Sequence, residues 1–263
     1  MNYIETSYLR GSSFEKLQKI PNKKISYKLF QELLSGIDSE SEFLKRKPQI
    51  LKAKKLNAVI DWRSIKAVVF NSFCVDANKD KEKNAIKGII DYINEETNYQ
   101  DLNDDILLKK FGINITMLVK RDQLQVQELI TATHYYTSYE KKVHGFDRTF
   151  DLNGNNPEIY SAVELDLRSF ISDLSKYIES VLFKIGHVEC HNLEKYYTGA
   201  LNCFARCSGM YNHNTIMNGN YLAKNDGNDF QHLFYLDEND TVYSKDHIFK
   251  QFERYGYIKL VSE

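Results

Sequence analysis

The sequence predicts an α/β fold, with a parallel sheet flanked by helices, built from both ends of the chain and interrupted by a long, mostly helical insertion. Short apolar strands alternate with helices near both termini, whereas the middle of the chain places apolar residues at helical spacing. Only 3 Pro and 12 Gly occur in 263 residues, which leaves few turns and disfavours an all-β sandwich or barrel. We expect residues 1–75 and 210–263 to form the α/β core and residues 76–209 to form the insertion.

The composition is that of a globular protein with balanced charge. Hydrophobic residues make up 42% of the chain, and 35 Lys and Arg nearly offset 36 Asp and Glu. A near-neutral chain argues against a surface that coats a polyanion, so a nucleic-acid contact would need a local basic patch. Four cysteines are too few for a disulfide framework, and no apolar run approaches the ~18 residues of a membrane span. Because the first residues also lack a signal peptide, we expect a cytoplasmic protein with no membrane partner.

Turn-forming and apolar residues divide the first 75 positions into short elements. Ser13 is placed to cap a helix that carries Leu17, and Pro21 begins a break before the next helix. The apolar run at 67–70 fits a strand or a buried helix, because periodicity does not separate the two. The other expected elements are a strand at 2–7 and helices at 13–20, 25–37 and 39–56.

From about residue 80 onward the pattern is mainly helical. Apolar residues recur three and four positions apart at 86–93 and again at 163–182, as on one face of a helix. The stretch 146–157 contains Asn-Gly-Asn-Asn-Pro and is the clearest loop. We expect helices within 80–145, 158–185, 193–207, 229–236 and 246–254, turns at 218–220 and 225–228, and strands at 240–244 and 255–261.

Four carboxylates share one kind of position, at the end of a predicted strand or in the first turns of an adjoining helix: Glu5, Glu32, Asp229 and Asp246. Ligands of parallel α/β sheets bind beyond the carboxyl ends of the strands, so these side chains are expected to converge there. Converging carboxylates repel one another unless a cation neutralises them, and oxygen ligands favour Mg²⁺ or Mn²⁺. Asp226 is a further candidate ligand, and the Ser244 hydroxyl is a candidate hydrogen-bond donor to a ligand carboxylate.

Each of these residues also has a plainer interpretation. Asp229 and Asp246 are placed to cap the helices that follow them, since Asp is a favoured N-cap residue. Glu5 and Glu32 fit a solvated strand end and a helix surface, and the plain alternative for Asp226 is an ordinary turn residue. His232 lies one helical turn after Asp229, and we expect it to be a histidine with satisfied hydrogen bonds at an interface rather than a catalytic group.

The order of these motifs resembles that of PIN domains of the VapC-like toxin branch. The similar segments, within residues 1–45 and 220–263, are YIETSYL at 3–9, ELLSGI at 32–37, Asp229-x-x-His-Leu and Ser244-x-Asp246. The resemblance implies a metal-dependent endoribonuclease that holds Mg²⁺ or Mn²⁺ with Glu5, Glu32, Asp229 and Asp246. It also implies a toxin or defence role, an antitoxin or other regulatory protein as a candidate partner, and a candidate homodimer.

Three features depart from the family pattern. Glu5 stands where the family usually has Asp, the interval between Glu5 and Glu32 is short, and the helical middle is far longer than in compact toxins. Thr6 keeps the Thr or Ser that follows the first ligand in the family, which implies a supporting role beside the ligands. The departures leave two alternatives open: a PIN-like module that has lost catalysis and binds RNA or protein, and a helical interaction protein.

A basic cluster follows Glu32 and is the candidate RNA-binding surface. Its members lie between positions 45 and 55 and are Lys45, Arg46, Lys47, Lys52, Lys54 and Lys55. Cations flanking an acidic site would hold a phosphate backbone, although a solvated helix face has equal weight.

A second stretch at 134–142 mixes tyrosines with lysines, and packing is the favoured interpretation there. Buried thiols are likewise favoured over a zinc site for a His/Cys group without zinc-motif spacing: His187, Cys190, His191, Cys203 and Cys207.

Overall fold

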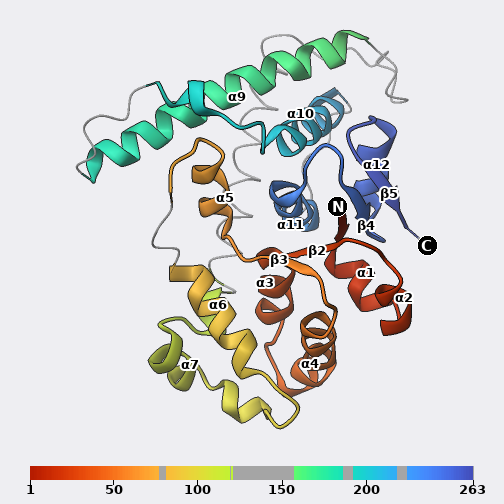
Figure 1. The fold of residues 1–263 in the computed structure, drawn as a ribbon, viewed down its shortest axis with the longest axis vertical. Helices are drawn as coiled ribbons and strands as arrows, with labels where there is room; N and C mark the ends of the chain where they lie inside the picture. The colour runs from red at the N-terminus through yellow and green to blue at the C-terminus, as the bar shows by residue number, and fades with distance from the viewer. Residues whose placement is uncertain (77–80, 119, 121–156, 186–191, 218–223, 263) are drawn as a thin grey trace.

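A computed structural model describes residues 1–76, 81–118, 120, 157–185, 192–217 and 224–262. Its centre is a five-stranded parallel sheet with the strand order β3-β2-β1-β4-β5 (Figure 1). The strands are β1 (Asn2–Ile4), β2 (Lys23–Ser26), β3 (Val59–Asp61), β4 (Thr241–Tyr243) and β5 (Lys259–Val261). The described strands come from residues 2–61 and 241–261, so the sheet is built from both ends of the chain, as predicted.

Helices flank the sheet on both sides. The α-helices of the first half are α1 (Thr6–Gly11), α2 (Phe14–Gln18), α3 (Tyr27–Ser35), α4 (Glu40–Lys54), α5 (Ile65–Asn71), α6 (Lys81–Tyr92) and α7 (Asp104–Phe111). Those of the second half are α9 (Pro157–Lys184), α10 (Asn202–Met217), α11 (Lys224–His232) and α12 (His247–Arg254). Short 3₁₀ helices are η1 (Tyr99–Leu102), η2 (Leu193–Tyr196) and η3 (Leu233–Tyr235). A helix long and apolar enough to cross a membrane is not found in the described part of the chain.

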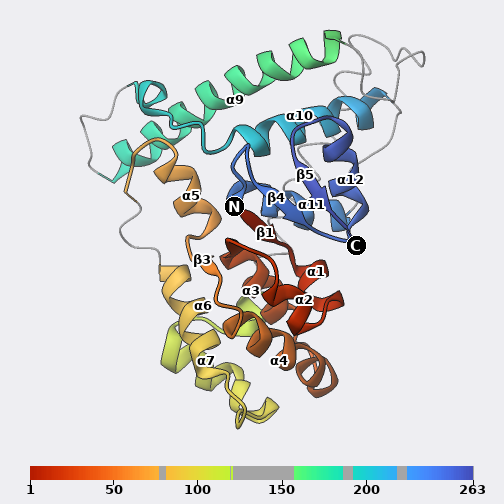
Figure 2. The same ribbon diagram turned by 45° about the vertical axis from the view of Figure 1, so that its right-hand side comes forward.

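The direction of the connections explains which helices lie on which side of the sheet. From β1 through β2 to β3 the chain moves one way along the sheet, and from β4 to β5 it moves the other way. Because crossovers between parallel strands are right-handed, this reversal places α1–α4 on one side and α12 on the other (Figures 1 and 2). Helices α9 and α10 pack together at the far end of the molecule from α4 and α7 in both views.

β1 is the central strand, and its last two residues are protected from solvent. Tyr3 and Ile4 are completely buried, and Tyr3 pairs with Val242 of β4. A parallel strand covered on both faces needs apolar residues in succession, which Tyr-Ile supplies. The hydrophobic cluster around this strand also contains residues from the middle of the chain, such as Ile86. The middle segment therefore shares a core with the sheet, and its description as an insertion stays a prediction.

Most long helices and the C-terminal strands lie where the sequence predicts them. α4 begins after Ser39, α9 matches the expected helix at 158–185, and β4, α12 and β5 follow in the predicted order. Residues 67–70 lie in α5, so the run is a buried helix rather than a strand. The predicted turn at 218–220 and the 134–142 stretch fall outside the described residues, as does the predicted loop up to residue 156.

Several local predictions are wrong. The first strand ends at Ile4, because Glu5 is the N-cap of α1 and the residues after it are helical. The start of the expected 25–37 helix belongs to β2, and β3 is a strand that the sequence analysis does not predict. The expected turn at 225–228 lies within α11, and the expected 193–207 helix is divided into η2 and α10. In each case pairing or packing outweighs the local preference of a few residues.

The N-cap of α4 offers a test of the local energetics. Ser39 Oγ accepts a hydrogen bond from Glu42 N at 3.3 Å. Replacing Ser39 with alanine is expected to lower the free energy of unfolding by about 1 kcal/mol, because an N–H group in the first turn loses its partner. Urea unfolding followed by circular dichroism measures the change, with the exposed Ser41→Ala as matched control. Equal midpoints for the two variants would contradict the role of the cap.

Candidate metal centre at the carboxyl edge of the sheet

The candidate site lies at the carboxyl edge of the sheet, between β1 and β4. These strands are neighbours, and the connections run away from them in opposite directions. Such a reversal of strand order marks the place where open α/β sheets bind ligands. Glu5 directly follows β1 and Ser244 directly follows β4, so the fold joins residues that are 239 positions apart in the sequence.

Glu5 is buried and is held through one of its two carboxylate oxygens. It is 2% exposed and occupies the N-cap position of α1. Its Oε2 accepts hydrogen bonds from Ser7 N at 2.9 Å, from Ser7 Oγ, and from Ser244 Oγ at 3.1 Å. Its Oε1 is turned the other way and lies 3.7 Å from His232 Nε2. The hydroxyls therefore fix the carboxylate while one oxygen remains directed into the site.

Glu32 comes from α3 and is held in the same manner. Its Oε2 accepts a hydrogen bond from Thr6 Oγ1 at 2.5 Å. Its Oε1 lies 3.1 Å from His232 Nε2 and 3.7 Å from Nζ of Lys28, one helical turn earlier on α3. The Lys28 side chain is completely buried, so the protein places a positive charge inside this edge of the site.

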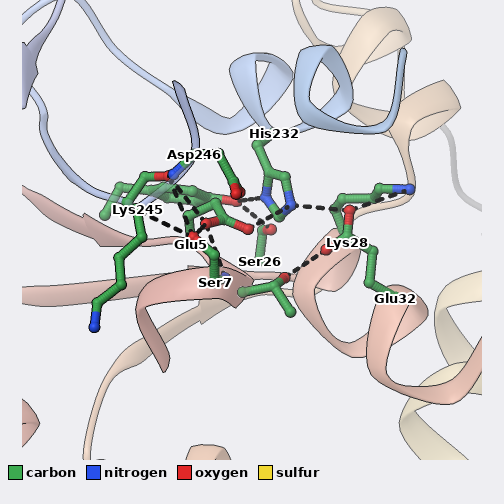
Figure 3. Close-up of polar contacts among 11 residues, drawn as sticks. Glu5, Ser7, Ser26, Lys28, Glu32, His232, Lys245 and Asp246 are labelled. Atoms are coloured by element: carbon green, nitrogen blue, oxygen red, sulfur yellow. Dashed lines mark hydrogen bonds and ion pairs between the residues drawn. The ribbon is translucent and has the colours of Figure 1, made fainter. Parts of the chain in front are cut away.

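His232 is the last residue of α11, and its ring lies between the two glutamates (Figure 3). The side chain is completely buried. Nδ1 is 2.6 Å from the Tyr3 hydroxyl, which is in turn 2.7 Å from Ser26 Oγ at the end of β2. Nε2 is buried and makes no hydrogen bond of acceptable geometry in the described part of the chain, although it faces both carboxylates.

Asp229 and Asp246 lie beside this group and are half-buried. Asp229 is in the second turn of α11 and is not its N-cap, so the capping interpretation is wrong for this residue. Asp246 does hold the N-cap position of α12, but its side chain makes no capping hydrogen bond. The Asp226 residue is helical in α11, and its side chain lies outside the described residues.

Burial and mutual repulsion make two of the carboxylates costly to ionise. Burial raises the pKa of the Glu5 carboxyl to about 7; the Glu32 and Asp246 carboxylates act in the same direction, and His232 opposes them. Burial, followed by repulsion from Asp246, raises the pKa of Asp229 to about 8. Asp229 and Asp246 are therefore within electrostatic range of each other and of Glu5.

Glu32 and His232 stabilise each other's charged forms. Burial alone would raise the pKa of Glu32, but His232 and Lys28 outweigh it and lower that pKa to about 2. Burial alone would lower the pKa of His232, but the Glu32 and Glu5 carboxylates outweigh it and raise that pKa. The site thus combines one carboxylate, Glu32, that two nearby cations neutralise with two, Glu5 and Asp229, whose pKa is raised.

Glu5, Glu32 and His232 form the one group of three metal-capable side chains found in the described part of the chain. One ligand atom from each lies within 4.8 Å of the others. Ligands bound to one ion at roughly 2.0–2.2 Å are separated by no more than about 4.4 Å, so the group is close to the spacing that an ion requires. This group could therefore hold a metal ion.

Comparisons with known proteins do not add a family to this geometry. No family model matches the chain, and no curated protein or solved structure is significantly similar to it. The resemblance to PIN domains therefore stays a prediction based on the motifs.

The supporting hydroxyls that the sequence singles out are in contact with the glutamates. Thr6 donates to Glu32 and Ser244 donates to Glu5, which links each hydroxyl to a candidate ligand. The roles of these residues in binding or catalysis stay predictions.

The six residues of the candidate RNA-binding surface each contact the protein itself. Four donate to backbone carbonyls: Arg46, Lys47, Lys52 and Lys54. Three pair with glutamates: Lys45, Arg46 and Lys55. Of these six, Lys45 and Lys55 are the exposed ones and keep most of their surface available to a phosphate backbone. A role in RNA binding stays a prediction.

Two of the candidate zinc ligands, Cys203 and Cys207, are free cysteines. Cys203 and Cys207 are buried in α10, and burial raises the pKa of Cys207. Both cysteines are buried, as predicted, and the choice between a thiol and a zinc ligand stays a prediction. The other three members of the group, His187, Cys190 and His191, lie outside the described residues.

Of the three residues at the centre of the site, the sequence predicts Glu5 and Glu32 as ligands but assigns His232 another role, and it does not single out Lys28 or Tyr3. His232 is buried as expected, but Nε2 is unsatisfied and faces two glutamates instead of completing a hydrogen-bonded interface. Two local signals were available. Asp229 and His232 are three residues apart, and Lys28 and Glu32 are four apart, so each pair shares a helix face. The hydroxyl of Tyr3 had no such signal, because its partner is distant in the sequence.

Proposed function

We propose that this protein is a metal-dependent endoribonuclease with a PIN-like fold. The observation that carries the proposal is the convergence of four carboxylates at the carboxyl edge where the strand order reverses. They come from after β1, from α3, from α11 and from after β4, in the order of the PIN-like motifs. These carboxylates belong to Glu5, Glu32, Asp229 and Asp246.

The charge of the site supports a divalent cation. Four carboxylates carry as many as four negative charges, while Lys28 contributes one buried positive charge beside Glu32. Carboxylates within range of one another repel, and a divalent cation removes that repulsion. Carboxylate oxygens are ligands that Mg²⁺ and Mn²⁺ accept, and the cation would activate water and neutralise the charge of a scissile phosphodiester.

Side chains around the site orient the two glutamates. Hydroxyls fix one oxygen of Glu5 and of Glu32, so the other oxygen of each is directed inward without side-chain rearrangement. Asp229 and Asp246 are half-buried, as is Glu32, whereas Glu5 is buried. RNA as the substrate class follows from the PIN-like resemblance, with the exposed cations near α4 as candidate backbone contacts.

A PIN-like module without catalysis, binding RNA or protein, is the second candidate, and one observation favours it. Lys28 Nζ and His232 Nε2 both approach Glu32 Oε1, at 3.7 and 3.1 Å. These contacts neutralise part of the acidic cluster from within the protein. A module of this kind would keep the carboxylates as part of the scaffold and would gain no stability from a divalent cation.

The test is incubation of the purified protein with RNA and with single-stranded DNA, in Mn²⁺ or in EDTA. We expect RNA cleavage in Mn²⁺ and none in EDTA. The variant Asp229→Asn/Asp246→Asn controls for contaminating nuclease, because it keeps the buried group intact and should cleave more slowly. RNA binding without cleavage, together with a melting temperature that Mn²⁺ does not raise, would favour the binding module.

A further inference from the structure

We propose that His232 binds the metal through Nε2, so that Glu5, Glu32 and His232 form a mixed nitrogen and oxygen ligand set. The inference rests on the proposed function and extends it, because the PIN-like motifs point to carboxylates alone. It begins with a polar atom that the protein leaves unsatisfied. Nε2 is completely buried, and among the described residues it has no hydrogen-bond partner.

Nε2 is directed at two carboxylates rather than at an apolar wall. It lies 3.1 Å from Glu32 Oε1 and 3.7 Å from Glu5 Oε1. If Nε2 carries a lone pair, all three atoms are acceptors and repel one another at these distances. If it carries a proton, the nearest acceptor is Glu32 Oε1 at 3.1 Å, but the N–H is not well directed at that oxygen. A divalent cation between the three atoms satisfies the nitrogen and both oxygens at once.

The other ring nitrogen is held as metal-binding histidines require. Nδ1 lies 2.6 Å from the Tyr3 hydroxyl, which lies 2.7 Å from Ser26 Oγ. A hydroxyl accepts as well as donates, so Tyr3 can accept the Nδ1 proton and donate its own to Ser26. This arrangement fixes the ring and leaves the Nε2 lone pair for the metal. Tyr3 is thereby a positioning residue, acting through His232.

The chemistry of this ligand set identifies the class of metal. Mg²⁺ prefers oxygen ligands in strict octahedral geometry, whereas an imidazole nitrogen favours the transition metals. A site that adds His232 to two glutamates therefore selects Mn²⁺, Co²⁺ or Zn²⁺ over Mg²⁺. The carboxylates alone predict either Mg²⁺ or Mn²⁺. The added imidazole nitrogen favours Mn²⁺ of these two metals.

Electron spin-echo spectroscopy of the Mn²⁺ complex of the wild-type protein identifies the ligand directly. A nitrogen bound to Mn²⁺ modulates the echo at ¹⁴N frequencies, and we expect this modulation. Bound Mn²⁺ without ¹⁴N modulation would overturn the inference. The absence of Mn²⁺ binding would overturn it as well.

Two variants provide an independent measurement by isothermal titration calorimetry with Mn²⁺ and Mg²⁺. His232→Asn removes Nε2 and is expected to weaken Mn²⁺ binding more than Mg²⁺ binding. Tyr3→Phe removes the acceptor for Nδ1 and is expected to weaken Mn²⁺ binding by about 10–100-fold, as loss of such support does at other metal sites. His247→Asn changes an exposed histidine of α12 and should leave both affinities unchanged. Equal losses for the two metals in His232→Asn would indicate a structural role only and would overturn the inference.

The outcomes separate this inference from the proposed function. RNA cleavage by a protein whose Mn²⁺ shows only oxygen ligands would overturn the role of His232 and leave the nuclease proposal standing. Nitrogen modulation in a protein that cleaves no RNA would support the role of His232 and count against the nuclease.

Discussion

Replacing Glu5 with glutamine is expected to lower Mn²⁺-dependent RNA cleavage by about 10³-fold while the protein stays folded. Glu5 supplies the most buried carboxylate of the candidate metal centre, and glutamine keeps its length but removes its charge. A catalytic metal lowers the activation free energy by several kcal/mol, and each ~1.4 kcal/mol changes the rate tenfold. Initial rates with a labelled single-stranded RNA measure the change.

The same substitution is expected to separate catalysis from folding. Removing one negative charge relieves repulsion between Glu5 and Glu32, so the metal-free variant should melt at or above the melting temperature of the wild type. Mn²⁺ should raise the melting temperature of the wild type but not of the variant, because a ligand that binds only the folded state stabilises it. Thermal unfolding in EDTA and in Mn²⁺ measures both effects.

Glu15→Gln is the matched control for this prediction. Glu15 lies on α2, close in sequence to Glu5, but it is exposed and outside the candidate metal centre. Its substitution should leave the cleavage rate and the Mn²⁺-dependent stabilisation unchanged. Wild-type cleavage by Glu5→Gln, with the control behaving normally, would show that this carboxylate does not hold the catalytic metal.

The parts of the fold that could be predicted are those with local signals. α9 shows apolar residues three and four positions apart over its whole length, and α4 begins at a serine that caps it. The alternation of strands and helices at both ends likewise predicted a parallel sheet. The strand order was beyond this reasoning, because pairing of β1 with β4 depends on contacts across more than 200 residues.

The strands that were missed have weak local signals. β2 contains two lysines in four residues, and β3 has three residues, of which one is acidic. Each is a strand because it pairs with a neighbour in the sheet, not because its own residues favour extended backbone. The opposite error occurs at 225–228, where Asn, Asp and Gly favour a turn but the segment lies in α11.

The residues of the candidate metal centre likewise include some that local signals predict and one that they do not. Glu5 and Asp246 could be found from the sequence because each follows a recognisable strand, and parallel strands end at one edge. His232 could not be assigned, because its environment comes from β1 and α3, which are about 200 residues away in the chain. Its direction toward both glutamates is a property of the packed structure, with no counterpart in the local spacing.

Replacing Lys28 with methionine is expected to destabilise the metal-free protein and to make it depend on Mn²⁺. The Lys28 ammonium is completely buried and lies 3.7 Å from Glu32 Oε1. Removing one partner of a buried ion pair typically costs about 3–5 kcal/mol in the free energy of unfolding. Because His232 Nε2 still lies 3.1 Å from Glu32 Oε1, the loss is expected at or below the lower end of this range. Urea unfolding in EDTA of protein purified with Mn²⁺ measures this loss.

Mn²⁺ is expected to restore much of that stability, because it would supply the positive charge that Lys28 provides in the wild type. The Mn²⁺-dependent gain should therefore be larger in Lys28→Met than in the wild type. Lys24→Met is the matched control: Lys24 is also nearly buried and pairs with Asp240 at 3.5 Å, in a separate ion-pair network that includes the N-terminal ammonium. It should lose stability without a larger response to Mn²⁺.

The contrast between the two lysine variants decides whether the acidic cluster is a metal site or a scaffold. In a metal site, Lys28 and the cation compete to neutralise Glu32, so loss of the lysine must strengthen Mn²⁺ binding. In a scaffold neutralised from within, loss of the lysine destabilises the protein and no divalent cation restores it. An identical response to Mn²⁺ in Lys28→Met and Lys24→Met would therefore indicate a binding module without catalysis, even though the sequence motifs resemble those of a nuclease.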